Sequence, residues 1–218
     1  MSRTEPAAAL AEPDRDCPLC PRLVAYREAN RAAHPDWWNG PAPSFGDPQA
    51  RLLVVGLAPG RTGANRTGRP FTGDFAGVLL YETLVGAGFA EGHYAARPDD
   101  GLRLVDCMIS NAVRCAPPGN KPETREEATC RPFLAARIAA LPRQKVIVTL
   151  GDVARRNVLR ALGIKASAGV GGHGARFDTG RYALINSYHC SRLNTNTGRL
   201  TPAMFQAVFE TAKGVLKT

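Results

Sequence analysis

Four of the six cysteines are spaced as ligands of a metal centre. Cys17 and Cys20 form a Cys-x2-Cys pair, and a wider Cys-x14-Cys pair is formed by Cys115 and Cys130. Four thiolates complete a tetrahedral zinc site or hold an iron–sulfur cluster. Zinc ribbons usually carry two close pairs, so the wide second spacing favours iron–sulfur and leaves zinc open. The other alternative is that these four are unrelated buried cysteines. Cys107 lies within a strand pattern, and we expect it to be a core residue.

A glycine- and arginine-rich stretch, residues 56–74, is the longest unusual segment of the chain. Its five glycines and three arginines suit the close approach of an anion. It lacks the Gly-Lys-Ser/Thr of a P-loop and the Gly-x-Gly-x-x-Gly of dinucleotide sites. Asp74 at its end is a candidate for acid–base chemistry, although an Asp before an apolar run more often caps a helix. Phe71, taken alone, is more often a core residue than a ligand contact.

Two further polar side chains follow apolar runs. Asn111 ends one strand pattern and His189 follows another. A histidine in such a position is a candidate for proton transfer or hydrogen bonding to a ligand, and a structural histidine is the alternative. An Asn at a strand end is commonly a turn former.

These residues are positioned by alternating strand and helix patterns. We predict strands at 51–57, 104–113, 145–150 and 182–187, and helices at 75–89, 124–141, 152–162 and 201–216. A capping box at Thr124 and Glu127 begins the second helix, and residues 175–177 form a possible hairpin with the last strand. The alternation indicates a single-domain, three-layer α/β/α fold with a central, mainly parallel four-stranded sheet. A flexible N-terminal lead, residues 1–16, precedes this domain, which we place at 17–218.

In open α/β sheets, ligands bind outside the carboxyl ends of the strands. The polar loops lie there: residues 56–60 after the first strand, 110–115 after the second and 188–194 after the fourth. We therefore expect three loops far apart in the sequence to form one cleft.

The composition defines the class of protein and suggests a partner. With 218 residues, 44% of them hydrophobic, the chain suits one globular core rather than a disordered or membrane protein. Its net charge of +9 suggests a polyanionic partner, with a merely basic surface as the alternative. No apolar run is long enough for a membrane span or an export signal, so we expect a cytoplasmic protein.

Taken together, three segments resemble the uracil-DNA glycosylase superfamily, most closely its type B branch, or fifth family. They are Gly56-Leu-Ala-Pro-Gly60 with residues 63–74, Ser110-Asn-Ala-Val-Arg-Cys115 with residues 116–122, and His189-Cys-Ser-Arg-Leu-Asn-Thr-Asn-Thr-Gly198. The resemblance extends from Cys17 to the last helix and makes 17–218 a uracil-DNA glycosylase-like domain. It implies a [4Fe-4S] cluster held by Cys17, Cys20, Cys115 and Cys130.

The resemblance also implies an enzyme that flips a damaged base out of DNA and hydrolyses its N-glycosidic bond, leaving an abasic site. His189 would stabilise the departing base anion, Asn111 would bind the Watson–Crick edge, and Phe71 would stack on the base. Asp74 would orient water or stabilise the sugar cation. Gly56, Ala58 and Gly60 would complete the substrate pocket.

The same resemblance assigns the contacts with DNA. Leu193 matches an apolar wedge that fills the base stack when the base leaves it. Some of the phosphate contacts are expected from the arginines of these loops, which are Arg61, Arg66, Arg69, Arg114 and Arg192. The partner would be DNA containing uracil or another damaged base, bound by a monomer associated with the nucleoid.

Two positions depart from the strict uracil enzymes of the superfamily. Ala58 stands where those enzymes carry a water-activating acid, which shifts that role to Asp74. Gly60 stands where they carry a bulky aromatic that excludes a 5-methyl group. A roomier pocket follows, so we expect activity on 5-substituted uracils and on deaminated purines such as hypoxanthine.

Two other functional classes stay open from the sequence. The first is a non-catalytic iron–sulfur module that binds DNA at abasic sites, which the absence of an acid at Ala58 favours. The second is a nucleotide-binding redox protein that uses the cluster for electron transfer. The set of Asp74, Asn111 and His189 favours the enzyme.

Overall fold

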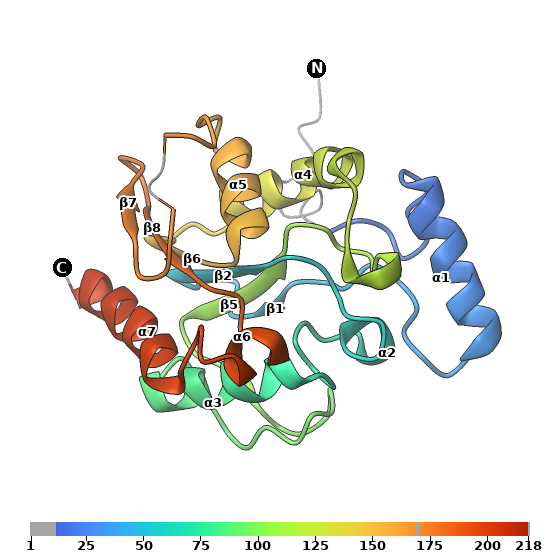
Figure 1. Ribbon diagram of the computed structural model, residues 1–218, viewed down its shortest axis with the longest axis horizontal. Helices are drawn as coiled ribbons and strands as arrows, with labels where there is room; N and C mark the ends of the chain where they lie inside the picture. Colours follow the sequence, from blue (N-terminus) through green and yellow to red (C-terminus); the bar gives the residue numbers. More distant parts are fainter. Residues whose placement is uncertain (1–11, 169–170, 218) are drawn as a thin grey trace.

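A six-stranded sheet lies between two layers of helices in the computed structural model, which describes residues 12–168 and 171–217 (Figure 1). The strand order is β1-β5-β2-β6-β8-β7. The four central strands run parallel and are β5 (Cys107–Asn111), β2 (Leu52–Gly56), β6 (Val146–Leu150) and β8 (Ala183–Ser187). All residues of these strands are buried, as expected for a parallel sheet covered on both faces. The three-layer fold and the four parallel strands are confirmed.

The helices divide between the two faces of the sheet. On one face, α3 (Phe75–Ala87) packs against α7 (Pro202–Lys217), and on the other, α4 (Thr124–Ala139) packs against α5 (Asp152–Ala161) (Figure 1). Alternate strand residues serve the two cores: Val54 packs toward α3 and α7, and Val55 toward α4 and α5. The remaining helices are α1 (Pro21–Ala33), α2 (Ala64–Thr67), α6 (Arg192–Asn196) and a 3₁₀ turn (Pro118–Asn120).

The prediction of a four-stranded sheet missed a short edge strand. β1 (Phe45–Gly46) pairs antiparallel with β5, and β7 (Arg176–Asp178) forms the anticipated hairpin with β8. A separate ribbon joins β3 (Ala90–Glu91) to β4 (Arg103–Leu104). Two-residue strands carry too little periodicity to be read from sequence.

The capping box of α4 lies one residue before its predicted place. Glu123 is the N-cap, and its box partner is Glu126 rather than Glu127. Glu126 also pairs with Arg22 of α1 at 2.7 Å, which stabilises this choice. Thr201 begins α7 as predicted, because its hydroxyl accepts from the backbone N–H of Met204 at 3.2 Å.

Residues 12–16, which we assigned to the flexible lead, contact the domain. The Glu12 carboxylate accepts from the backbone N–H of Ser44 at 3.1 Å and pairs with Arg137 at 2.7 Å. The domain therefore reaches back at least to residue 12, and the rest of the predicted lead lies outside the described residues. Within the described ranges, no helix is both long and apolar enough to cross a membrane.

Candidate active site

The carboxyl ends of the parallel strands form one pocket, as the loop positions predicted. Its volume is about 320 Å³, within the usual range for small-ligand sites. The predicted residues that line it are Ala58, Gly60, Arg61, Phe71, Asp74, Asn111, His189 and Arg192. Gly56 lies directly behind them, since a Cβ added there would sit 2.5 Å from both Asn111 Oδ1 and Phe71 Cζ. Three loops that are well separated in the sequence, 56–60, 110–115 and 188–194, thus meet at one site.

Asp74 caps a helix with one carboxylate oxygen and faces the glycine-rich loop with the other. It is the N-cap of α3, where Oδ1 accepts from the backbone N–H of Gly77 at 3.2 Å. Oδ2 faces the glycine-rich loop, since an added Cβ would lie 3.1 Å away at Gly60 and 2.3 Å away at Gly63. Burial raises the pKa of Asp74, and hydrogen bonds from backbone N–H groups oppose that rise. The two glycines therefore make room for a partly desolvated carboxylate.

Phe71 adopts a backbone conformation that needs support. Its φ is +54°, which is rare for a bulky residue. The Tyr94 hydroxyl donates to the Phe71 carbonyl at 3.0 Å and accepts from the Gly73 N–H at 3.3 Å. Tyr94 in turn stacks on Tyr81, with ring centroids 4.6 Å apart. The Tyr94 hydroxyl thus bonds two backbone groups of the turn that connects Phe71 to Asp74.

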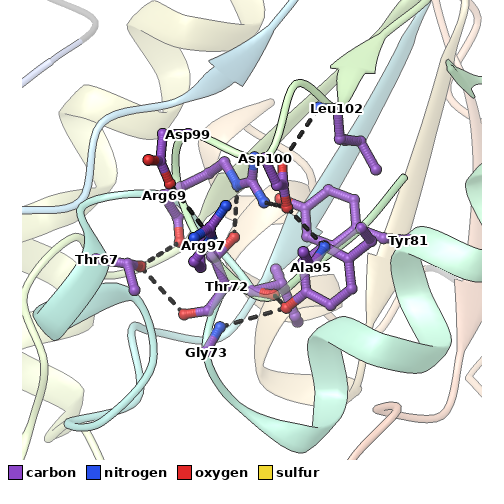
Figure 2. A network of polar contacts seen from close by, with 12 residues as sticks. Thr67, Arg69, Thr72, Gly73, Tyr81, Ala95, Arg97, Asp99, Asp100 and Leu102 are labelled. Atoms are coloured by element: carbon purple, nitrogen blue, oxygen red, sulfur yellow. Dashed lines mark hydrogen bonds and ion pairs between the residues drawn. The ribbon is translucent and has the colours of Figure 1, made fainter. Parts of the chain in front are cut away.

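A buried ion pair underlies this turn (Figure 2). Arg69 donates to both oxygens of Asp100 at 2.7 and 2.8 Å, and its Nε donates to Thr72 at 2.7 Å. Only 5% of the Arg69 side chain and none of the Asp100 side chain is exposed. The guanidinium lies 5.3 Å from the ring centroid of Tyr81 and 5.7 Å from that of Tyr94.

The expectation that Arg69 contacts DNA phosphate is therefore wrong. Each of its N–H-bearing nitrogens is used inside the protein, and its two hydrogen bonds to Asp100 hold the pKa of that carboxyl well below its usual range. Arg114 cannot reach DNA phosphate either, because its side chain is 1% exposed and pairs with Glu12 at 3.1 Å. The sequence shows the arginines but not their carboxylate partners.

Asn111 presents an unsatisfied acceptor to the pocket. It is the last residue of β5 and is 2% exposed. Among the described residues, its Oδ1 has no hydrogen-bond partner. A buried amide oxygen without a donor costs about 1–3 kcal/mol. A ligand N–H placed there would recover that free energy.

His189 is a neutral group within the same pocket. Burial lowers its pKa, so the imidazole is uncharged near pH 7 and carries one N–H donor. Its ring centroid lies 6.1 Å from that of Phe71. Its carbonyl accepts from the Asn194 amide at 2.8 Å, and Ser191, the N-cap of α6, continues the turn.

Exposed residues lie on the segments that form the pocket or directly follow it in the chain. Leu193, on α6, is 72% exposed, which is unusual for a leucine and suits a wedge. Arg192 is exposed beside it and lies over the Phe75 ring at 5.2 Å. Arg61 lines the pocket and donates to Asn30 at 2.8 Å. Arg66 is also exposed.

The four predicted cysteine ligands line a single, largely apolar cavity. Cys17 and Cys20 precede α1, where Pro21 occupies the favourable first helical position. Cys115 follows β5, and Cys130 lies within α4. Burial raises the pKa of Cys115 to about 12 and of Cys130 to about 11, so these thiols need a metal to become thiolates.

The four thiols of this cavity are a donor set for a metal group, either a zinc ion or an iron–sulfur cluster. A single zinc needs four ligand atoms around one point, at about 2.3 Å for sulfur. Within the described chain, no three His, Cys, Asp or Glu side chains are grouped closely enough to hold one ion. Cys107 and Cys190 are buried in the core beside α3 and α7 and do not line the cysteine cavity.

Several residues of the site were missed by the sequence patterns. Thr62, Phe75, Ala76, Asn120 and Ser191 also line the pocket. Tyr94 and Asp100 support it from a loop of irregular sequence, where no periodicity marks them. Asn120 has a φ of +57° after Gly119, so this Gly-Asn pair was the one local signal of a turn at the pocket.

A carboxylate, a neutral imidazole and an amide oxygen with no partner among the described residues thus lie together at the carboxyl ends of parallel strands, the usual place of a ligand site in α/β proteins. Comparison with known sequences narrows this class. The chain belongs to the uracil DNA glycosylase superfamily, whose sequence model matches residues 43–213.

The chain is also similar over most of its length to curated members of this superfamily. It is 47% identical to a type-5 uracil-DNA glycosylase of Thermus thermophilus, covering 90% of this chain and 92% of the relative. It is 43% identical to one of Mycobacterium leprae, covering 90% of each chain. A third, from Pyrobaculum aerophilum, is 40% identical over 85% of this chain and 83% of its own.

Proposed function

We propose that the protein is a monofunctional DNA glycosylase of the type-5 kind, which hydrolyses the N-glycosidic bond of uracil and related bases in DNA. The names of its relatives support uracil as a substrate. The observation that carries the proposal is the buried, unpartnered Asn111 Oδ1 in a pocket shared with Asp74 and His189. Uracil N3–H is the donor that this oxygen lacks.

The pocket residues meet the charge changes of glycosidic cleavage. As the bond breaks, positive charge develops on the sugar and negative charge on the base. The Asp74 carboxylate stabilises the sugar cation and orients water, while the His189 N–H donates to the base oxygen. A preorganised donor of this kind contributes roughly 3 kcal/mol to the transition state. Phe71 packs against the flipped ring, and its fixed turn keeps it there without reorganisation.

Gly60 sets the range of bases that the pocket accepts. It lines the pocket, and an added Cβ would meet only Asp74 Oδ2 and, at 3.9 Å, the Gly63 nitrogen. A bulky side chain at this position would fill space beside the base and crowd Asp74. With glycine there, the pocket has room for 5-substituted uracils and for hypoxanthine.

A [4Fe-4S] cluster is the cofactor that we assign to Cys17, Cys20, Cys115 and Cys130. When bound, it supplies a covalent cross-link between the N-terminal segment, the loop after β5 and α4. Arg114 connects this region to the base pocket: its backbone N–H donates to Cys130 Sγ at 3.3 Å, and it lies three residues after Asn111. We therefore assign the cluster a structural role that braces Asn111. DNA is the partner, and we propose that a monomer acts on it in the cytoplasm, at the nucleoid.

A panel of DNA duplexes tests the activity and its range. We expect the wild-type protein to leave abasic sites at uracil, 5-hydroxymethyluracil and hypoxanthine, as measured by alkaline strand cleavage. Xanthine and thymine mismatches complete the panel. Cleavage at unmodified uracil alone would contradict the roomy pocket. If no substrate yields an abasic product, the protein is a non-catalytic DNA-binding module instead.

Removal of one cysteine ligand tests the cluster. For Cys17→Ala we expect bound iron to fall to background and soluble yield and thermal stability to fall, because the cross-link is lost. The activity of the fraction that folds should change less than its yield. Cys107→Ala is the matched control, since this buried thiol lies outside the cavity and should leave the iron content unchanged. Normal iron content with selective loss of turnover in Cys17→Ala would contradict the assignment.

Truncation of the wedge tests base extrusion. For Leu193→Ala we expect kcat/KM on paired uracil to fall about tenfold, since about 1.5 kcal/mol of apolar contact with the stack is lost. The loss should shrink on single-stranded uracil, where extrusion costs less. Because Leu193 is 72% exposed, the melting temperature should not change. Equal losses on paired and unpaired uracil would show that Leu193 is not a wedge.

A further inference from the structure

An open groove of about 650 Å³ lies beside the base pocket. Residues just before α2 line the pocket, and the last two residues of α2 line the groove. Both tryptophans of the chain line it, Trp37 and Trp38. The charged residues of its wall are Arg15, Asp36, Arg66 and Arg97. The groove is therefore both aromatic and basic, with three cations against one acid.

Arg61 lies between the pocket and the groove. This residue lines the pocket, and its guanidinium lies 5.4 Å from the Trp37 ring centroid and 2.9 Å from His34 Nε2. Arg66 lies beside the turn that carries Phe71 and Asp74, because a Cβ added at Gly73 would lie 2.8 Å from Arg66 Nη2. The groove is therefore within reach of nucleotides next to a base held in the pocket.

The cations of the groove differ from the two buried arginines. Arg97 is 68% exposed and touches Asp99 only at 3.7 Å, and Arg66 is exposed. Arg15 is partly engaged within the protein, since its guanidinium lies 4.2 Å from the Trp38 ring centroid and donates to the Trp38 carbonyl. Trp37 is half-buried, with His34 stacked on it at 3.9 Å.

We propose that this groove binds a single-stranded stretch of the substrate DNA beside the damaged nucleotide. Trp37 contacts an unpaired base, while Arg66 and Arg97 contact phosphates. This rests on the proposed function for its choice of DNA. Arginines alone would serve a duplex, whose base faces are covered by stacking, whereas aromatic side chains between cations are typical of single-strand sites. The enzyme would thus favour damage at a junction between paired and unpaired DNA.

The experiment measures binding rather than cleavage. The probes are fluorescent duplexes that carry an uncleavable abasic-site analogue. In the control duplex both flanks of the analogue are paired. In the two other forms, about six nucleotides of the damaged strand, on the 5′ or on the 3′ side of the analogue, are unpaired. We expect the wild-type protein to bind one of the unpaired forms more tightly than the fully paired duplex. Trp37→Ala should weaken that binding at least about fivefold and change binding to the paired form less than about twofold.

Arg97→Ala provides a second variant that does not disturb the core. On the preferred unpaired form, the slope of log affinity against log salt should fall by about 0.7, the value for one lost phosphate contact. Arg103→Ala is the matched control, because Arg103 is equally exposed at 68% and pairs with Glu91 on the β3–β4 ribbon. It should bind both DNAs as the wild type does.

The outcomes separate this proposal from the enzyme assignment. Equal losses on paired and unpaired flanks, or wild-type binding by both groove variants, would overturn the groove proposal even if uracil is excised. A wild-type protein that excises nothing but shows the expected binding differences would support the groove and remove the glycosylase assignment. If Arg103→Ala changes DNA binding as much as Arg97→Ala does, the effect comes from the loss of any surface positive charge, and the proposal is overturned.

Discussion

Asp74→Asn should lower kcat for uracil excision by about 10²- to 10³-fold while leaving the fold intact. The substitution removes the negative charge that faces the sugar cation. It keeps an oxygen that can accept from the Gly77 N–H, and Asn and Asp are about equally good N-caps. The melting temperature should therefore match that of the wild type. Asp74→Ala should lose the cap as well, at about 1 kcal/mol of stability.

The pH dependence of the same variant identifies the ionised form. Burial raises the pKa of Asp74, so its carboxylate is lost as the pH falls through a value above the 3.8 of an unperturbed Asp. Wild-type kcat/KM should fall on this acidic limb, and the limb should be absent in Asp74→Asn. No limb should follow from His189 near pH 6.5, because burial lowers the pKa of that imidazole. Wild-type activity in Asp74→Asn would remove Asp74 from the mechanism.

Asp100→Leu should have the largest effect on stability, about 3–5 kcal/mol in the free energy of unfolding. It leaves the Arg69 guanidinium buried without its bidentate partner (Figure 2). Chemical denaturation of wild type, Asp100→Leu, Arg69→Met and the double variant measures the coupling. The double variant should be more stable than Asp100→Leu, because no charge is then left unpaired.

Asp99→Asn is the matched control for this pair. Asp99 is the neighbouring acid, but 77% of its side chain is exposed, so the change should stay within about 0.5 kcal/mol. The pair's stabilisation also depends on pH. Because Arg69 lowers the pKa of Asp100 in the folded protein, the contribution is complete well above about 3.9, the unfolded value, and is lost as the pH falls toward the folded pKa. Equal stability of Asp100→Leu and wild type near neutral pH would contradict this account.

The sheet was predictable because its central strands are buried on both faces. Such strands appear in the sequence as continuous apolar runs, of which Leu52–Gly56 is an example. The edge strand Phe45–Gly46 was not predictable, since two residues have no period. The N-cap of α4 was misplaced because both Thr124 and Glu123 begin a capping pattern. The structure uses Glu123, whose box partner Glu126 also pairs with Arg22, a residue far away in the sequence.

The site was predictable where residues follow strands. The positions of Asn111 and His189 relative to their strands placed them at one edge before any contact was known. The fate of Arg69 was not predictable, because Asp100 comes from a loop without a regular pattern and only the folded chain brings them together. The role of Tyr94 under Phe71 was hidden for the same reason. Sequence patterns locate residues along elements, whereas partners across loops depend on the tertiary fold.

The order of the cysteines in the sequence determines when the cysteine cavity can form during translation. Some of its lining residues precede strand β5 in the sequence and the others follow it. Its last thiol, Cys130, comes 110 residues after Cys20. A ribosome adding about 5–20 residues per second needs about 5–20 seconds to span that distance. For most of this interval the first cysteine pair is on the nascent chain without either partner, because Cys115 is made only fifteen residues before Cys130. The cavity can close only after α4 has been made, so any group that it holds must arrive after more than half of the protein has been translated.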